Sequence, residues 1–226
     1  MKSFYARNPL KPFAALVFCA LLNGQAWGEG QRAPLPDPAI DTPLAKITTQ
    51  NTAVFAGGCF WGVQAVFQHV KGVVSATSGY SGGEAKTAYY ERVSDGDTGH
   101  AESVQVVYDP SKVSYGQLLK VYFAVAHNPM QLNRQGPDSG TQYRSEIFVS
   151  SIEQLKVANA YMQQLTASQV YPGKIVTRVS NLTAFYPAEA HHQDFLHLHP
   201  NHPYIVVNDL PKLDNLQATL PALYRQ

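Results

Sequence analysis

The sequence predicts a single α/β domain with two layers, in which helices cover a mixed sheet. Short β-branched or alternating runs predict strands, and they alternate along the chain with longer stretches of helical periodicity. At least one helical stretch between two strands is long enough to serve as a crossover connection. The 226 residues suffice for one domain with a sizeable core and terminal extensions.

The elements in the first half of the domain follow from their residue patterns. The apolar run 52–56 predicts a buried strand, and residues 63–67 have helical spacing. Residues 70–78 are β-branched and predict a second strand. Residues 102–108 alternate and stop at Asp109-Pro110, which predicts a third strand followed by a turn.

The second half continues the alternation of helix and strand. The expected elements are a helix over 114–126, a loop over 131–142, a strand over 144–150, a helix over 151–166, a strand over 175–179 and a short helix after Pro187. The loop is long, and long loops in compact domains are often functional. From Pro203 onwards three more prolines and weak periodicity predict no element.

Composition also divides the chain into segments. Residues 1–28 resemble a secretory signal peptide, with Lys2, Arg7 and Lys11 before a short apolar run and a cleavage site expected near Gly28. Residues 29–46 carry four prolines and predict a flexible leader. The catalytic domain is expected over 47–210, and residues 211–226 are expected to form a tail. The mature protein would then be exported, to the periplasm or beyond.

Charge and cysteine content restrict the function. With 17 basic and 16 acidic residues, the chain shows no sign of a nucleic-acid partner or of an anionic membrane partner. Its two cysteines are Cys19 and Cys59. Cys19 would leave with the signal peptide, so one thiol would remain in an oxidising compartment.

Cys59 occupies a position typical of a reactive thiol. It follows Gly57-Gly58 at the predicted turn from a strand to a helix, and Phe60 and Trp61 come directly after it. Glycines permit a tight turn. Unpaired amides at a helix N-terminus favour an anion, so we expect the Cys59 thiol to have a lowered pKa. The pattern predicts a thiolate nucleophile beside an apolar wall.

Four sequence blocks carry a resemblance to a known family. They are Gly57-Gly58-Cys59-Phe60-Trp61, the block 96–102 (GDTGHAE), the block 138–145 (DSGTQYRS) and the block 185–193 (FYPAEAHHQ). In this order and spacing they resemble the A-type peptide methionine sulfoxide reductases, and the resemblance spans roughly 52–200. It implies a mixed sheet with a ferredoxin-like core and long coil segments. It also implies reduction of methionine S-sulfoxide, free or in proteins, to methionine, as protein repair after oxidation.

The resemblance assigns roles to individual residues. Cys59 is the expected nucleophile and Glu102 the expected acid, since burial would keep a carboxyl protonated near neutral pH. Tyr90 and Tyr143 align with tyrosines that bind the sulfoxide oxygen. Phe60, Trp61 and Asp138 are expected at the substrate. His192 and Gly58 are expected to support the site without touching the substrate.

The resemblance also implies how the enzyme is recycled. Oxidation of Cys59 would leave a sulfenic acid. Family members often carry a further cysteine near the C-terminus, and some carry one at the position of Gly62, but this sequence has neither. We therefore expect no bound cofactor, and an external reductant that is a thioredoxin-like protein or a small thiol. A monomer is expected.

Two other functions are compatible with parts of the sequence. His191, His192, His197, His199 and His202 lie within a short span, so a secreted histidine-rich metal-binding protein is the main alternative. No recurring spacing with a carboxylate or thiol supports it, and we expect no metal site. A cysteine hydrolase, with Cys59 paired to a histidine and an acid, is the second alternative.

Overall fold

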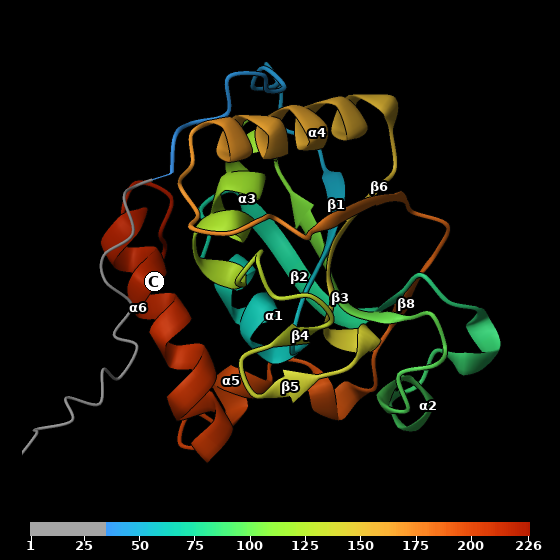
Figure 1. Ribbon diagram of the computed structural model, residues 1–226. Coiled ribbons are helices and arrows are strands. Elements are labelled where there is room, and N and C mark those ends of the chain that lie inside the picture. The colour runs from blue at the N-terminus through green and yellow to red at the C-terminus, as the bar shows by residue number, and fades with distance from the viewer. Residues whose placement is uncertain (1–34) are drawn as a thin grey trace, which may run out of the picture. The chain divides into compact units, whose positions relative to one another are not determined.

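A computed structural model describes residues 35–226, so the predicted signal segment 1–28 lies outside the described residues. Within this part the chain forms a six-stranded sheet in the order β7-β6-β1-β3-β2-β8 (Figure 1). The strands are β1 (Asn51–Gly57), β2 (Val73–Ser81), β3 (Ala101–Tyr108), β6 (Ser145–Val149), β7 (Arg178–Asn181) and β8 (Phe185–Pro187). The pair β6 and β7 is parallel, and the other neighbours are antiparallel, so the sheet is mixed.

Two split β-α-β units form the centre of the sheet. The helix α1 (Phe60–Gln68) connects β1 to β2, and β3 lies between these two strands. The helix α3 (Tyr115–Val121), extended by a π-helical turn η2 (Tyr122–Ala126), leads from β3 towards β6, with β1 between them. The four strands therefore have the ferredoxin-like order. The predicted α/β class, mixed sheet and ferredoxin-like core are confirmed.

Both faces of the central strand β1 are covered. Ala53 and Phe55 belong to the main core beneath the helices, whereas Val54 and Ala56 belong to a smaller cluster on the opposite face. Side chains of a strand alternate between faces, so a strand buried on both sides has a continuous apolar sequence, as observed here. The coil around Leu182 and the ring of Phe185 cover the smaller cluster.

The strands and helices of the structure lie close to their predicted positions, although several of them begin or end a few residues away. The strand expected over 70–78 runs from Val73 to Ser81, and the strand expected over 175–179 is β7. The helix expected over 151–166 is α4 (Ile152–Ala167), whose N-cap Ser151 accepts a hydrogen bond from the Gln154 amide. The loop 131–142 contains a small hairpin of β4 (Arg134–Gln135) and β5 (Asp138–Ser139).

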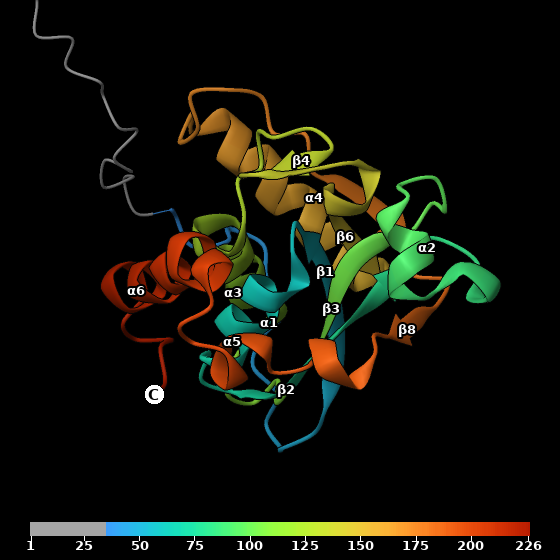
Figure 2. The ribbon, with the colours of Figure 1, turned by 90° about the horizontal axis from the view of Figure 1, so that it is seen from below.

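The segment after Pro203 is not a tail. It forms a π-helical turn η5 (Ile205–Asp209) and the helix α6 (Leu210–Thr219), which packs against α1 (Figures 1 and 2). Leu216 is fully buried in the main core. The prolines and weak periodicity of this segment are compatible with a helix, because Pro211 lies in the first turn of α6, where the amide hydrogen that proline lacks makes no bond within the helix.

The described part of the predicted leader packs on the domain. Leu35 is buried in the main core, and the Tyr161 hydroxyl donates to the carbonyl of Pro36. The Asp41 carboxylate accepts hydrogen bonds from the Ser114 hydroxyl and the Gly116 amide, at the start of α3. The expectation of a flexible leader is wrong for residues 35–46, because buried apolar and capping contacts outweigh the preference of prolines for open coil.

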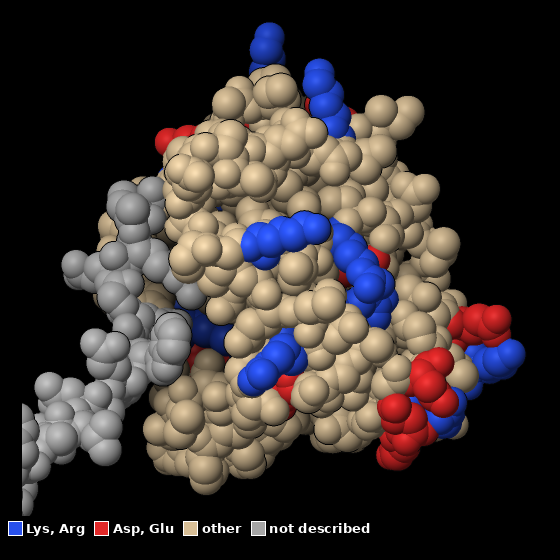
Figure 3. Space-filling model, viewed as in Figure 1, with Lys and Arg blue, Asp and Glu red and all other residues tan. Residues whose placement is uncertain are grey.

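Charged side chains are interspersed by sign on the face seen in Figure 3. Acidic and basic side chains lie side by side at the lower right of this view. In and around α2 (Tyr90–Ser94), Arg92 pairs with Asp95 and Asp97, and Lys86 pairs with Glu84. Such exposed pairs contribute little to stability. Among the helices of residues 35–226, each is too short or too polar to cross a bilayer.

Replacement of Asp41 should test the attachment of residues 35–46. We expect Asp41→Ala to lower the free energy of unfolding by about 1–2 kcal/mol, since it removes the acceptor for the Gly116 amide at the positive end of a helix. Urea denaturation measures the change, with the exposed Asp214→Ala as the matched control. Equal stability of the two variants would show that the carboxylate does not hold this segment.

Candidate active site

Cys59 lies between the end of β1 and the start of α1. It is the residue that precedes the first turn of the helix, and its side chain is 8 % exposed. The Trp61 amide donates a hydrogen bond to its sulfur. The predicted position at a strand-to-helix turn is therefore present in the structure.

Glu102, near the start of β3, reaches the same helix turn. Its Oε2 accepts a hydrogen bond of 3.0 Å from the Phe60 amide. The carboxyl of Glu102 and the sulfur of Cys59 therefore accept from two neighbouring amides in the first turn of α1, those of Phe60 and Trp61. Glu102 is 3 % exposed. Burial raises the pKa of its carboxyl to about 8, against the opposing effect of the Phe60 hydrogen bond. The group is thus protonated at neutral pH.

The ionisation state expected for Cys59 is wrong. Burial raises the pKa of the thiol well above its ordinary value, and the nearby carboxylates of Glu102 and Asp209 raise it further. The Trp61 amide and Lys212 act in the opposite direction but more weakly. A helix N-terminus lowers the pKa of a thiol only where its effect exceeds that of lost hydration. At Cys59 the loss of hydration has the larger effect. At neutral pH the resting residue is the thiol.

Tyr90 is positioned by an acid that the sequence analysis did not select. The Glu189 carboxylate accepts from the Tyr90 amide at 2.9 Å and from the Tyr80 hydroxyl at 2.8 Å. It thereby satisfies a free amide at the start of α2. The ring of Tyr90 packs on His192, with ring centroids 4.5 Å apart. Burial raises the pKa of Tyr90, and the charges of Glu102 and Cys59 add to the rise.

Tyr143 and Asp138 come from the loop between η2 and β6. Tyr143 ends a short 3-10 turn (Thr141–Tyr143), and burial together with the Glu102 charge raises its pKa. The Asp138 carboxylate accepts a hydrogen bond from the Tyr204 hydroxyl. Charges of Asp138 and Cys59 also influence Tyr143. Cys59, Glu102, Tyr90, Tyr143 and Asp138 thus form one electrostatically coupled group.

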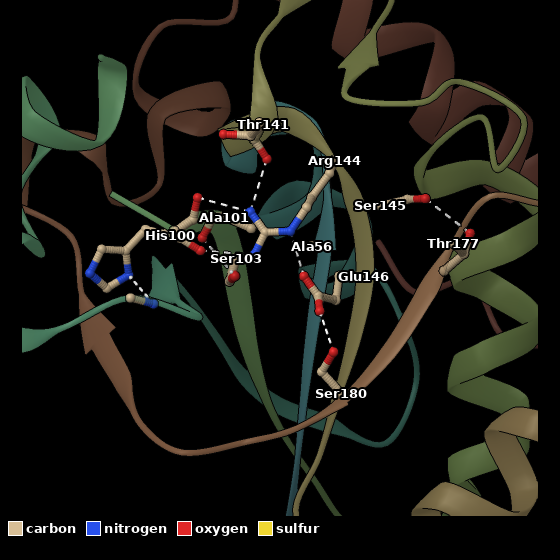
Figure 4. A network of polar contacts seen from close by, with 12 residues as sticks. Ala56, His100, Ala101, Ser103, Thr141, Arg144, Ser145, Glu146, Thr177 and Ser180 are labelled. Atoms are coloured by element: carbon tan, nitrogen blue, oxygen red, sulfur yellow. Dashed lines mark hydrogen bonds and ion pairs between the residues drawn. The ribbon is translucent and has the colours of Figure 1, made fainter. Parts of the chain in front are cut away.

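A buried arginine joins the loop before β3, the strand of Glu102, to the loop that carries Tyr143. The Arg144 guanidinium donates to the carbonyls of Gly99, His100 and Thr141 at 2.9–3.0 Å (Figure 4). Its Nε donates to Glu146 at 2.5 Å, and Glu146 accepts from the Ser180 hydroxyl. The planar guanidinium provides several fixed donors, which suits it to hold backbone carbonyls in place.

Trp61 presents the apolar wall of the site. Its ring is partly buried and stacks on Phe195 with centroids 3.7 Å apart, and its Nε1–H donates to His192 Nδ1 at 3.3 Å. Burial lowers the pKa of His192, which keeps the ring neutral and able to accept. Phe60 is 1 % exposed and packs on Tyr80 and His192. Successive helix residues point in different directions, so Phe60 is buried in the core whereas Trp61 is partly exposed.

Gly58 allows the loop 128–139 to lie close to Cys59. Its φ is +91°, and a Cβ at this position would lie 2.5 Å from Gln135 Cβ. Gln135 is fixed by Asn128, because its Oε1 accepts from the Asn128 amide and its Nε2 donates to the Asn128 carbonyl. Gly58 therefore supports the site through its backbone.

Several residues at the site were not predicted. Tyr204 lies edge-on to Trp61 with centroids 5.8 Å apart, and its pKa is raised mainly by burial and then by the Cys59 charge. Phe195, Glu189, Asp209 and Lys212 were also missed. Tyr204, Asp209 and Lys212 lie in the segment assigned to weakly patterned coil and tail. The helical spacing of Leu210, Leu213 and Leu216 was the available signal.

In the part of the chain that the structure describes, neither alternative function finds support. Within residues 35–226, no group of three His, Cys, Asp or Glu side chains is arranged to hold a metal ion. Histidine rings pack on aromatic neighbours, as His199 does in a tilted contact and His202 does edge-on against Phe195. The groups that shift the pKa of the Cys59 thiol, besides burial, are Glu102, Asp209, Lys212 and the Trp61 amide.

Comparison with known proteins identifies the family. The family model described as peptide methionine sulfoxide reductase matches residues 51–222. The chain belongs to the A-type peptide methionine sulfoxide reductases. It is 63 % identical over 176 residues to peptide methionine sulfoxide reductase MsrA 2 of Mesorhizobium japonicum, covering 78 % of this chain and 90 % of the relative. It is 55 % identical over 181 residues to MsrA 2 of Synechocystis, covering 79 % and 85 %.

Solved structures of this family share the fold. Methionine sulfoxide reductase A of Corynebacterium diphtheriae superposes with a TM-score of 0.60 at 31 % identity, over 75 % of this chain and 87 % of that one. Reduced Mxr1 of Saccharomyces cerevisiae gives a TM-score of 0.62 at 30 % identity, over 71 % and 94 %. The chain is therefore an oxidoreductase that converts methionine sulfoxide to methionine, and the metal-binding alternative is not supported.

The raised pKa of Glu102 should appear in the pH dependence of stability. The folded protein holds this proton more tightly than the unfolded chain, so the carboxyl destabilises the fold as pH rises from about 4.5 to about 8. Gln at this position stays neutral and can still accept from the Phe60 amide. Each pKa unit by which the folded and unfolded states differ changes the free energy of unfolding by about 1.4 kcal/mol.

We therefore expect Glu102→Gln to raise the melting temperature above pH 8 while leaving it almost unchanged near pH 4. Thermal unfolding followed by circular dichroism between pH 4 and pH 9 measures the difference. Glu91→Gln, on the exposed side of α2, is the matched control. A difference that stays flat across this range would contradict a buried carboxyl of raised pKa.

Proposed function

We propose that Cys59 reduces the S epimer of methionine sulfoxide, free or in proteins, and that Glu102 supplies the proton for the departing oxygen. The hydrogen bond from the Phe60 amide to Glu102 supports this most directly. It fixes an acid, protonated at neutral pH, next to the residue that follows the reacting cysteine. A carboxyl group so placed can protonate an oxygen bound beside the sulfur.

The proposed first step conserves protons and electrons. The sulfur of Cys59 attacks the sulfoxide sulfur, and the Glu102 carboxyl proton passes to the sulfoxide oxygen. The carboxylate formed takes up the proton of the thiol. The hydroxyl group ends on Cys59 as a sulfenic acid, and methionine leaves after gaining two electrons. Because the exchange regenerates the acid, a neutral resting thiol is compatible with turnover.

The remaining polar groups bind the sulfoxide oxygen in this proposal. Tyr90 and Tyr143 supply hydroxyl donors, and the raised pKa of each keeps its proton in place. Asp138 is held by Tyr204 and orients polar groups within the site. The methyl group of the substrate packs on Trp61, whose ring is fixed by Phe195 and His192. Fixed donors stabilise charge that develops on the oxygen.

Single-turnover measurements test these roles. We expect Cys59→Ser to abolish methionine formation, and Glu102→Gln to slow it about 100- to 10,000-fold, because the variant has no proton to transfer. The wild-type rate should fall above about pH 8 as Glu102 ionises. Trapping with dimedone and mass spectrometry locates the sulfenic acid. Glu91→Gln should react normally. A normal rate in Glu102→Gln would exclude Glu102 as the acid.

We further propose a cycle that uses one cysteine of the enzyme. Cys59 is the free cysteine of the described residues, and no cysteine follows it in the sequence. An external thiol attacks the sulfenic acid, forms a mixed disulfide and releases water. A second external thiol then frees Cys59 and leaves as a disulfide. We propose a thioredoxin-like protein or a small thiol as the reductant, and no bound cofactor.

The full chain with Cys19→Ser tests the one-cysteine cycle. It should keep the turnover of the wild-type protein with dithiothreitol and with thioredoxin, since Cys19 takes no part. Intact-protein mass spectrometry after one turnover with a monothiol should show one mixed disulfide, on Cys59. Loss of turnover in Cys19→Ser would mean that a second protein thiol resolves the sulfenic acid.

Localisation and assembly complete the proposal. The basic start, the short apolar run and Ala26-Trp27-Gly28 support export to the periplasm with cleavage near Gly28. N-terminal sequencing of the exported protein tests this. We propose a monomer because one chain supplies all of the site residues named above. A sedimentation velocity measurement that gave a dimer would contradict it.

A further inference from the structure

The first turn of α1 faces two charged residues of the C-terminal segment. Gly62 is the third residue of the helix, and a Cβ there would lie 2.0 Å from Asp209 Oδ1 and 2.7 Å from Lys212 Nζ. Real side chains do not approach so closely. The space that any other residue at position 62 would fill is therefore occupied by this pair.

The buried Asp209 forms an ion pair with Lys212, whose side chain is 22 % exposed. Asp209 is 0 % exposed, and its Oδ1 accepts from Lys212 Nζ at 3.0 Å. Its other oxygen, Oδ2, has no hydrogen-bond partner among the described residues. A buried carboxylate that is half unsatisfied costs free energy relative to apolar packing. A contribution to the free energy of unfolding therefore does not explain why a carboxylate is buried at position 209.

The pair acts on the sulfur of Cys59 in two opposing ways. The thiol pKa is raised first by burial and then by Glu102 and Asp209, and Lys212 lowers it. Burial raises the pKa of Asp209 itself, and Lys212 opposes that rise, which favours the carboxylate. The titratable groups around the sulfur are Glu102 on β3, Tyr90 on α2, Tyr143 after β5, Asp138 on β5, His192 beside Phe60, Tyr204 before η5, and the pair Asp209 and Lys212.

We propose that Asp209, held by Lys212 in the space that Gly62 leaves, is a positioning residue that keeps the sulfur of Cys59 uncharged, both as the thiol and as the sulfenic acid. This inference rests on the one-cysteine cycle proposed above. A neutral sulfenic acid is open to attack by an external thiolate, which forms the sulfur–sulfur bond and releases water. An anionic sulfenate would repel that thiolate.

The same charge protects the oxidised enzyme. With no second cysteine among the described residues, the sulfenic acid waits until an external thiol arrives. Hydrogen peroxide can meanwhile transfer an oxygen atom to it, giving a sulfinic acid and water, and this product is not recovered by thiols. The electron-rich sulfenate reacts faster with peroxide than the neutral acid. A carboxylate beside the sulfur therefore limits this loss.

Paired charge variants in the full-length Cys19→Ser protein test the inference, because alkylation then reports Cys59 alone. The rate of reaction with iodoacetamide is followed against pH by intact-protein mass spectrometry. The pH at which the alkylation rate is half-maximal should fall by about one unit in Asp209→Asn and rise in Lys212→Met. In the double variant this midpoint should return close to that of the parent. Lys212→Arg keeps the cation and should leave the midpoint unchanged.

Loss of packing would give a different result. A variant that merely loosens α6 exposes the sulfur, so both single variants would move the midpoint in the same direction. That outcome, or no movement in either, would overturn the inference. Circular dichroism and thermal unfolding identify any variant that fails to fold, and the remaining single variant then still fixes the sign of the change.

A second measurement follows the oxidised enzyme. Each protein is treated with one equivalent of methionine sulfoxide and then with hydrogen peroxide, and the sulfinic acid is quantified. Asp209→Asn should form it several-fold faster than the parent. Equal rates would overturn the protective role. If the parent forms no sulfenic acid, the proposed function fails, whereas the alkylation profiles still test the ion pair.

Discussion

The hydrogen bond between the Phe60 amide and the Glu102 carboxyl is the contact on which the rest of the site depends. It joins the first turn of α1 to the central strand β3, and so fixes the acid and the sulfur relative to each other. It also occupies an amide that would otherwise favour an anion at Cys59. Together with burial, this leaves a protonated acid beside a neutral thiol.

The surrounding structure keeps that contact in place. Arg144 connects the loop before β3 to the loop that carries Tyr143, with Glu146 as its buried counterion. Glu189 attaches Tyr90 to Tyr80 from another part of the chain. Each of these groups satisfies several donors or acceptors at once, which is how polar groups are tolerated in a buried site.

The sequence was sufficient to predict the fold class, the central strands and the position of Cys59, because burial and helix periodicity are local patterns. Two of the four blocks also contain Glu102 and Tyr143, and the family resemblance between the blocks selected Tyr90. What could not be predicted depends on contacts between distant segments. Asp209 approaches α1 only because α6 folds back, and the desolvation that determines the pKa of Cys59 comes from packing. Residues 35–46 dock through Asp41 for the same reason.

The far end of α1 has a consequence for how the enzyme accommodates its substrates. Arg225 donates through its side chain to the carbonyls of Gln68 and Val73, and through its amide to the carbonyl of His69. Hydrogen bonds to Glu102 at one end and from Arg225 at the other restrain α1 against sliding along its axis. A helix restrained at both ends presents the same geometry around the sulfur to every substrate.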